Sequence, residues 1–454
     1  MASTRTSTAR TGPHRVPAQP GSETGWYPVA RSAEVGTTPV PVGAGGQAYV
    51  VVRLRPGAEV TALSARCPHR LVPLATATVV DGRLQCGYHG WQFNAEGRCV
   101  HIPSLGADGT PPPRADLSAP WAVEERDGWV WLAPERTPAV RPPRVAAPVP
   151  EPVPAPAPPA GPVFGNLDPA LEHAWHPVAL SAELHEGGYL QARLLGRNWT
   201  VHRRAGVLAA DPPAWGVTER HGLIWIAPAE PRDELLEVPE TTDARFTAGW
   251  LRPARTTAPA GLLADAFLDA AHVPFVHAGT AGAAAGEEVP GPEVTPEPGG
   301  FRGVQKQLSD DPEAGTGGNP LRRATYRYRA PFQLLQRVEE LDGGAVRTVL
   351  FLLQPEDADS TRVYTCVLLR GTGGAAVVPP DVVAAEVALQ QAVLAEDLAQ
   401  QAAMGSTGLP LLLRDELHVP ADRLGVALRR ALADLAADCA AADQATALQQ
   451  RASA

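Results

Sequence analysis

The sequence predicts an α+β protein in which two β-rich modules precede a domain of mixed strands and helices. Residues 26–136 alternate short Val- and Trp-rich stretches with Gly and Pro, which is typical of β-strands joined by turns. Part of this pattern returns after a proline-rich segment. The third domain, residues 232–454, adds strand-like stretches and ends in two Ala- and Leu-rich helices at about 380–404 and 421–447.

The bulk properties limit the class of protein. A chain of 454 residues is too long for one ordinary core, so two or three domains are expected. The net charge of −10 argues against a nucleic-acid-binding surface. Five cysteines are too few for a disulfide framework and fit a reducing cytoplasm. No stretch approaches the roughly 20 apolar residues of a membrane helix, so we expect no membrane association.

The first module, residues 25–137, lies between two segments of biased composition. Residues 1–24 are rich in Ser, Thr, Arg and Pro and have no apolar centre, so we expect a disordered tail and no secretory signal. Inside the module, "AYVVVRL" and "GWVWLAP" are the clearest strands. Residues 138–163 are proline-rich, which predicts an extended, semi-rigid linker with a rise of about 3.1 Å per residue.

The second module, residues 164–231, is interpreted as a shortened copy of the first. "GWYPVARSAEV" at 25–35 returns as "AWHPVALSAEL" at 174–184, and "EERDGWVWLAP" at 124–134 returns as "TERHGLIWIAP" at 218–228. The offset is 149 residues at the front and 94 at the back, so the copy lacks 55 residues from its middle. The shared order of the two matches predicts a degenerate repeat.

The first candidate metal site lies in the segment that the second copy lacks. Cys67-Pro-His69 and Cys86-Gly-Tyr-His89 each place a thiolate and an imidazole on a short turn, with sixteen residues between the pairs. Two such turns can hold a [2Fe–2S] cluster, with one iron bound through sulfur and the other through nitrogen. Tetrahedral zinc is the alternative, although zinc fingers usually pair Cys with Cys and His with His. The second copy contains no Cys and cannot carry such a cluster.

The second candidate metal site lies in "GLLADAFLDAAHVPFVH", which is expected to be a buried helix of the third domain. Asp265, Asp269 and His272 are spaced i, i+4 and i+7 and so share one helical face. The proline after His272 should break the helix and let His277 return to that face. Two His beside an acid suit iron(II), and a 2-His-1-carboxylate triad leaves positions open for dioxygen and substrate. The alternative is a surface helix with incidental histidines.

A third iron ligand must come from another segment, and "LQQAVLAEDLAQQ" offers Glu396 or Asp397. Asp397 shares a helical face with Val383 and Leu394, which favours it weakly. Glu396 also has apolar residues at helical spacing, and both acids could belong to a solvated helix face.

These motifs carry a resemblance to a known family. "CPHRLVPLATATVVDGRLQCGYHGWQFNAEGRCVHIPS" is similar throughout to the Rieske domain of aromatic-ring and demethylating oxygenases. "DAFLDAAHVPFVH" resembles the iron-binding helix of Rieske non-heme iron oxygenases, and the "ED" helix resembles that of the vanillate demethylase and dicamba monooxygenase group. The resemblance implies a β-rich Rieske domain, a catalytic domain with an antiparallel sheet flanked by helices, cluster ligands Cys67, His69, Cys86 and His89, and iron ligands His272, His277 and Asp397. The family normally has one Rieske domain, so the second, cluster-less module is a departure.

The resemblance also implies an activity and partners. The expected function is to hydroxylate or oxidatively demethylate a small aromatic or specialised-metabolite substrate, with O2 and Fe(II). "GAGGQAY" lacks the spacing of a dinucleotide-binding fingerprint, so we expect NAD(P)H to be oxidised by a separate ferredoxin reductase, with or without a ferredoxin. A homotrimer is implied as well. The alternatives are a Rieske electron carrier without oxygenase activity, an oxidative cyclase or desaturase, and a zinc-binding structural protein.

Asp269 is expected to be a catalytic residue that links the two metals. It precedes His272 by one helical turn, so its carboxylate can accept a hydrogen bond from that imidazole. The resemblance implies a second contact, with a cluster histidine of a neighbouring subunit, which here is His69 or His89. The linker and the extra module leave open that the cluster reaches the iron of its own chain instead.

Overall fold

Strands dominate the structure, and the predicted α+β fold class is confirmed. Apart from Thr24, the predicted tail at residues 1–24 lies outside the described residues. Side chains are not described for residues 306–308, 321 and 443–453. The computed structural model describes residues 24–145, 147–280, 288–308, 321–341, 344–371 and 377–453.

The N-terminal β region consists of small antiparallel sheets. Val50, Val51 and Val52 are completely buried because both faces of their strand are covered: Val51 packs in one apolar cluster and its two neighbours pack in another. The strand orders are β1 (Tyr27–Arg31), β10 (Trp129–Ala133) and β9 (Ala122–Arg126) in one sheet, β2 (Val40–Ala44), β3 (Gln47–Arg53) and β4 (Val60–Ser64) in the next, and β5 (Thr78–Val80), β6 (Arg83–Gln85), β7 (Gln92–Phe93) and β8 (Cys99–His101) in the third.

The second set of strands repeats the first two of these sheets. Even the irregularity in the pairing returns, between Pro28 and Ala30 in the first set and between Pro177 and Ala179 in the second. The described residues of the second set contain no counterpart of the β5–β8 sheet, which is where the first set carries its Cys and His turns. Its strand orders are β12 (His176–Leu180), β17 (Leu223–Ala227) and β16 (Gly216–Arg220), and β13 (Tyr189–Leu194), β14 (Arg197–Arg204) and β15 (Val207–Asp211).

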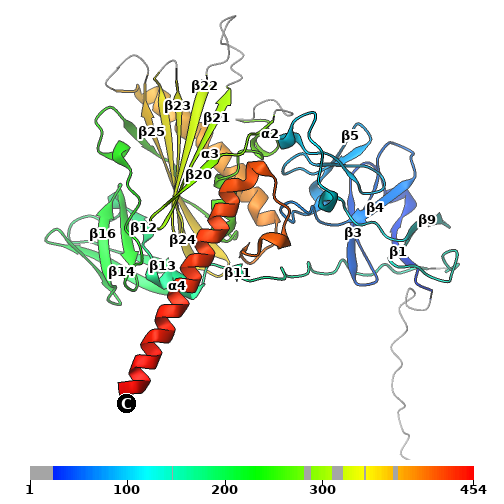
Figure 1. Ribbon diagram of the computed structural model, residues 1–454, viewed down its shortest axis with the longest axis horizontal. Coiled ribbons are helices and arrows are strands. Elements are labelled where there is room, and N and C mark those ends of the chain that lie inside the picture. Colours follow the sequence, from blue (N-terminus) through cyan, green and yellow to red (C-terminus); the bar gives the residue numbers. More distant parts are fainter. Residues whose placement is uncertain are drawn as a thin grey trace, which may run out of the picture.

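The proline-rich segment connects the two sets in an extended path along the N-terminal β region (Figure 1). The Trp26 indole donates a hydrogen bond of 2.7 Å to the carbonyl of Ala139, and Glu151 forms an isolated β-bridge with Gly43. The segment then enters β11 (Val163–Phe164), which pairs with β26 (Leu409–Pro410) of the third domain. Both ends of the segment are therefore fixed by hydrogen bonds.

The third domain is built on one large antiparallel sheet. Long strands rich in Val, Leu, Tyr and Phe bury most of their side chains in its centre, as in β24 and β25. The order is β18 (Thr247–Trp250), β25 (Ser360–Arg370), β24 (Val346–Asp357), β23 (Gln333–Glu340), β22 (Leu321–Arg329), β21 (Gly300–Leu308) and β20 (Glu293–Glu297), with β19 (Ala254–Thr256) also paired with β25.

In the described part of the third domain, four α-helices accompany this sheet. α3 (Pro380–Ala403) packs near β18 and β25, and α4 (Arg423–Ser453) crosses β20 and β21. The single helix expected over residues 261–277 is wrong: α1 covers Ala260–Phe267 and α2 only Val273–Val276. Between them, the Asp269 carboxylate accepts a hydrogen bond of 2.8 Å from the Ala271 amide, and this local bond replaces the helical pattern.

The three parts lie in a row, with the large sheet between the N-terminal β region and the second set of strands (Figure 1). One buried apolar cluster continues through all three parts and includes Leu63 and Phe93 of the first, Trp199 of the second, and Leu263 and Leu409 of the third. The N-terminal β region therefore packs on the same chain's third domain, at the end where α1 and α2 lie.

Candidate functional site

Two turns of the N-terminal β region present the predicted cluster ligands with the same backbone geometry. The Cys67 amide donates to Val72 and its carbonyl accepts from Leu71, while the Cys86 amide donates to Trp91 and its carbonyl accepts from Gly90. Leu71 and Gly90 both have positive φ, 54° and 69°, a conformation that glycine adopts readily. A Cβ on Gly90 would lie 2.2 Å from the Phe275 ring, so any side chain there would collide with this ring unless the ring moved.

The four side chains converge in a buried space that fits a [2Fe–2S] cluster. Cys67, Cys86, His69 and His89 are all at most 3% exposed, and the two imidazole rings lie 4.2 Å apart between centroids. His69 Nδ1 is buried without a hydrogen-bond partner, which a metal bond would satisfy. The hydrogen bond with Cys67 lowers the pKa of Cys86 to about 7, while burial and the same contact raise the pKa of Cys67 well above its usual value.

Three further predicted ligands meet at one point of the third domain. His272 and His277 come from either end of α2, and Asp397 comes from α3. Their atoms form a triangle: 3.1 Å between the two Nε2 atoms, 3.3 Å from His272 Nε2 to Asp397 Oδ1, and 3.1 Å from His277 Nε2 to the same oxygen. Adjacent ligands of an octahedral metal with bonds of about 2.1 Å lie about 3 Å apart, so this triangle matches one face of such a metal.

The electrostatics of the triangle favour a carboxylate between two imidazoles. Burial raises the pKa of Asp397, but hydrogen bonds from His272 and His277 outweigh it and leave that pKa below its usual value. Burial lowers the pKa of His277, while Asp397 and Glu396 together raise it. A divalent cation at this point would replace the protons that now hold these groups together.

The structure separates the roles of the two neighbouring acids on α3. Asp397 Oδ1 belongs to the triangle, whereas Glu396 Oε2 accepts a hydrogen bond of 2.7 Å from His277 Nδ1 and another of 2.8 Å from Thr280. Glu396 therefore orients the His277 ring so that its Nε2 faces Asp397.

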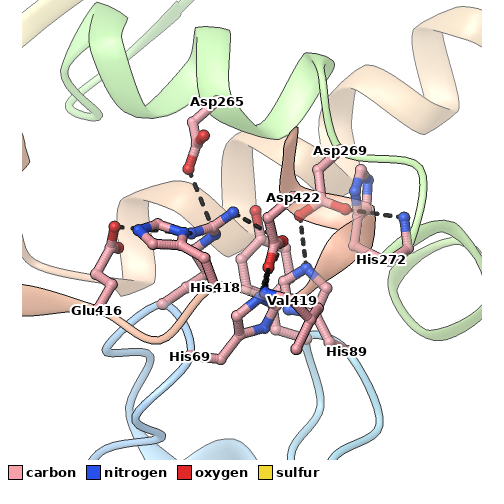
Figure 2. A network of polar contacts seen from close by, with 12 residues as sticks. His69, His89, Asp265, Asp269, His272, Glu416, His418, Val419 and Asp422 are labelled. Atoms are coloured by element: carbon pink, nitrogen blue, oxygen red, sulfur yellow. Dashed lines mark hydrogen bonds and ion pairs between the residues drawn. The ribbon is translucent and has the colours of Figure 1, made fainter. Parts of the chain in front are cut away.

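A single carboxylate lies between the two sites and binds one of them. Asp269 Oδ2 accepts a hydrogen bond of 2.7 Å from His89 Nε2, and Figure 2 shows Asp269 between His89 and His272. The ring centroids of His89 and His272 are 6.5 Å apart. Of the two histidines that the sequence left open, His89 is the one in contact with Asp269. The hydrogen bond expected between Asp269 and His272 is not present among the described residues, and His272 Nδ1 has no partner.

A second carboxylate, which sequence reasoning missed, binds the other histidine of the Cys/His site. Asp422 lies at the start of α4, and its two oxygens are 3.0 and 3.1 Å from His69 Nε2. Arg70 donates to Asp422 over 2.8 Å and to His418 over 2.9 Å. Burial raises the pKa of Asp422, but Arg70 and His69 hold it well below its usual range, so the group is a carboxylate.

Behind this pair lies a buried ionic network. Arg429 donates to both oxygens of Asp265, over 2.7 and 2.9 Å, and to Glu416 over 2.6 Å. Asp265 was predicted to share one helical face with Asp269 and His272. It binds arginines and does not join the metal triangle. The sequence "DRLGVALRRALADLA" contains Asp422 and Arg429 at i and i+7 of a helix, which is the only local signal for this network.

Two family models match the chain. The Rieske [2Fe–2S] domain matches residues 25–115, and the vanillate O-demethylase oxygenase C-terminal domain matches residues 256–438. The first range includes all four residues of the Cys/His site and the second includes all three residues of the triangle. The resemblance stated from the sequence is thereby confirmed.

Curated relatives match over shorter stretches. The dicamba O-demethylase oxygenase component of Stenotrophomonas maltophilia is 35% identical over 113 residues, which are 24% of this chain and 31% of that protein. The 3-chlorobenzoate-3,4-dioxygenase oxygenase subunit of Comamonas testosteroni is 38% identical over 109 residues, 24% of this chain and 25% of that protein. The chloroplast protein TIC 55 of Pisum sativum is 47% identical over 77 residues, 16% of this chain. The chain spans only 14% of that protein's length.

Among solved structures, dicamba monooxygenase bound to 3,6-dichlorosalicylic acid aligns with a TM-score of 0.42 and 18% identity, over 92% of this chain and 98% of that one. Within the part of the chain that the structure describes, no helix has the length and apolar character needed to cross a membrane.

Proposed function

We propose that this chain, which joins a Rieske [2Fe–2S] domain to a vanillate O-demethylase oxygenase C-terminal domain, is the oxygenase component of a Rieske oxygenase system. In this proposal it uses O2 and electrons from a separate reductase to hydroxylate or oxidatively demethylate a small aromatic or specialised-metabolite substrate. By their names, two relatives act on dicamba and on 3-chlorobenzoate, and the second of these compounds is a small aromatic acid, which supports the substrate class.

The observation that carries the proposal is the carboxylate between the two sites. Asp269 accepts a hydrogen bond from His89 of the Cys/His site, and its backbone lies three residues before His272 of the triangle. A Rieske electron carrier needs the first site alone. A buried acid that binds a histidine of the first site and lies three residues before a histidine of the second supports a function that uses both sites.

Each proposed ligand has a defined part. Cys67, Cys86, His69 and His89 would hold the [2Fe–2S] cluster, and His272, His277 and Asp397 would hold iron(II). When bound, the cluster supplies single electrons and the iron supplies a place for dioxygen beside the substrate. Asp269 and Asp422 accept the distal N–H groups of the two cluster histidines, which fixes their tautomers and leaves the other ring nitrogens for metal.

The electron source and the assembly complete the proposal. NAD(P)H would be oxidised by a ferredoxin reductase, with or without a ferredoxin, because the sequence has no dinucleotide-binding fingerprint. A cytoplasmic location stays a prediction from the few cysteines, and a homotrimer stays a prediction from the sequence resemblance. Asp269 as a catalytic residue, and the domain limits at residues 137, 163 and 231, belong to the proposal as well.

The test is substrate-dependent oxygen uptake by the purified protein with a surrogate reductase and NADH. A panel of methoxylated and chlorinated benzoates and of larger phenolic metabolites should contain a compound that raises oxygen uptake and yields a hydroxylated or demethylated product. An electron carrier would instead pass electrons to an acceptor, bind no iron beyond its cluster, and show no substrate-dependent oxygen uptake. That outcome would refute the proposed function.

A further inference from the structure

We propose that the Rieske domain docks on the iron-binding domain of its own chain, so that one chain holds a complete path from cluster to iron. The inference deepens the proposed function and rests on it for the identity of the two metal centres. It states which copy supplies the cluster to a given iron and is independent of how many chains assemble.

The contact between the two domains is buried, polar and specific. His89 binds Asp269, and His69 binds Asp422, with all four side chains under 10% exposed. Arg70 adds its bonds to Asp422 and to His418. Buried charged and polar side chains are costly without hydrogen-bond partners. A surface that carries them is therefore suited to contact a second surface that supplies these partners. Within this chain both sides of the contact are present and matched.

Backbone hydrogen bonds and close packing extend the contact around the histidines. The Leu417 amide donates to the Pro68 carbonyl over 2.9 Å, and the Val289 amide donates to the Ser104 carbonyl over 3.2 Å. The Tyr88 hydroxyl accepts a hydrogen bond of 2.7 Å from Gln401.

The path of the linker favours docking within one chain. The linker is bridged to the Rieske domain at Glu151 and becomes a strand of the third domain at Val163, twelve residues later, which in polyproline II conformation reach about 40 Å at most. That strand pairs with Leu409–Pro410, and the Gly161 amide donates to Asp415. Leu417 and Asp422, which bind the Rieske turn, follow directly in the sequence. One segment, residues 409–422, therefore receives both the linker and the docked domain.

The second set of strands cannot provide the cluster. It precedes the third domain directly in the chain and packs on β24, but it lacks both the β5–β8 sheet and any Cys. A Rieske domain placed there would not face Asp269. The added N-terminal domain and its linker instead bring a cluster site to the other end of the large sheet, where α1 and α2 lie (Figure 1).

A cysteine pair across the contact tests the inference without reference to activity. A Cβ on Gly106 of the Rieske domain would lie 3.4 Å from the Glu288 Cβ of the third domain, close to the separation of bridged cysteines. Gly106→Cys with Glu288→Cys in the full-length holoprotein, mildly oxidised, should form a disulfide within one chain. Denaturing, non-reducing electrophoresis should give one monomer band that migrates faster than the reduced protein, at every protein concentration. Each single variant is the matched control and should give no such product.

Other products of this experiment would overturn the inference. Covalent dimers or a ladder would show that the contact forms between chains. No disulfide, with both thiols reactive toward a maleimide, would show that the domains do not dock in this way. Failure of the proposed function would give a different result. A disulfide within one chain, combined with no substrate-dependent oxygen uptake, would support the docking and refute the oxygenase function.

A mixing experiment covers the case in which the strained Gly106 position disturbs folding. Cys86→Ser removes the cluster and Asp397→Ala removes the iron site, and the two chains are produced together with different affinity tags. Docking within one chain predicts that the clusters of the mixture, once reduced, stay reduced under O2 with substrate, as in the Asp397→Ala protein alone. Rapid cluster oxidation in the mixture, followed by absorbance, would mean that chains exchange electrons and would overturn the inference.

Discussion

At the scale of single residues, the position of one carboxyl group matters most. Asp269 accepts a hydrogen bond from the Ala271 amide with one oxygen and binds His89 of the Cys/His site with the other. The local bond that breaks the helix is therefore also the bond that aims the carboxylate at the other domain. A regular helix through His272 would have directed Asp269 along the same face as Asp265, toward the arginines.

The first prediction concerns Asp269→Asn. The amide has nearly the same shape and no charge, so both metals should stay bound and the cluster should still be reduced. Turnover should fall by about 100-fold because the charged link between the sites is lost. Metal analysis, cluster absorbance and steady-state oxygen uptake measure these three properties. The control is Asp359→Asn, at an exposed acid, which should have the same turnover as the wild type. If Asp269→Asn also turns over at the wild-type rate, the bridging role is wrong.

The second prediction separates the two acids of α3. Asp397→Ala removes an oxygen of the triangle and should lose the mononuclear iron while the cluster EPR signal stays unchanged. Glu396→Gln keeps a hydrogen-bonding group beside His277 and should retain the iron, with an affinity lowered by about 10-fold. Iron content after gel filtration decides between them. Loss of iron in the Glu396 variant alone would reverse the assignment.

The sequence located the candidate ligands but only part of their surroundings. Closely spaced motifs identified Cys67, His69, Cys86, His89, His272 and His277, since each pair is brought together by a few residues of chain. Asp397 was favoured but not decided by helical periodicity, because Glu396 has apolar neighbours at the same spacing. Asp422 was missed, since its contact with His69 spans 353 residues and only the packing of two domains creates it.

At the scale of elements, the second set of strands repeats the first two sheets of the N-terminal β region, and its described residues contain no counterpart of the β5–β8 sheet. Its histidines make other bonds: buried His176 contacts the Leu171 carbonyl at 2.7 Å, and His221 contacts the Leu236 carbonyl at 2.8 Å. Burial lowers the pKa of His176 to about 4, so this imidazole is neutral and structural at ordinary pH.

The third prediction follows from this absence of ligands. Cys86→Ser should abolish the reduced-state EPR signal completely, because the Cys/His turns of the N-terminal β region are the only ones in the sequence. Cys99→Ser should leave the signal unchanged, since burial raises the pKa of Cys99 to about 12 and its thiol lies against the His101 carbonyl. A residual Rieske signal in the Cys86 variant would place a cluster elsewhere.

The fourth prediction tests the second set of strands as a support for the large sheet. Trp225 of β17 is completely buried in a cluster that includes Leu350, Leu352 and Tyr364 of the sheet. Trp225→Ala should destabilise the protein by about 3–5 kcal/mol. Tyr189→Ala, at a side chain 73% exposed, should change stability by no more than about 0.5 kcal/mol. Equal denaturant midpoints for the two variants would argue against a supporting role.

The elements themselves were predicted unevenly. Strands with alternating or continuous Val, Trp and Leu could be read from the sequence, and the two long helices began within two residues of the predicted positions. The end of the helix before Asp269 could not be predicted from the sequence. The Asp269 side chain accepts a hydrogen bond from the Ala271 amide, which competes with helix formation and leaves no periodic signal.

At the scale of the whole molecule, the arrangement of the three parts depends on the linker. Its proline content predicted an extended conformation, but composition cannot say where a linker leads. The pairing of β11 with β26 and the bridge at Glu151 determine its course.

The fifth prediction is the effect of cutting this linker. Residues 155–158 are exposed and can be replaced by a specific protease site. The intact protein should have the same specific activity at every dilution, because a short tether holds the domains at an effective concentration of about millimolar. After cleavage, specific activity should fall on dilution and return on concentration. Cleaved protein that keeps full activity at nanomolar concentration would contradict the role of the linker.

The proposed docking of the two sites within one chain also has a genetic consequence. In an assembly whose sites are shared between copies, one defective copy damages the sites of its neighbours, and such alleles are dominant. Where His89 and Asp269 belong to the same chain, a chain without a cluster inactivates only its own iron. Co-expressed with the wild type, a Cys86→Ser allele should therefore behave as recessive, with activity in proportion to the number of intact chains.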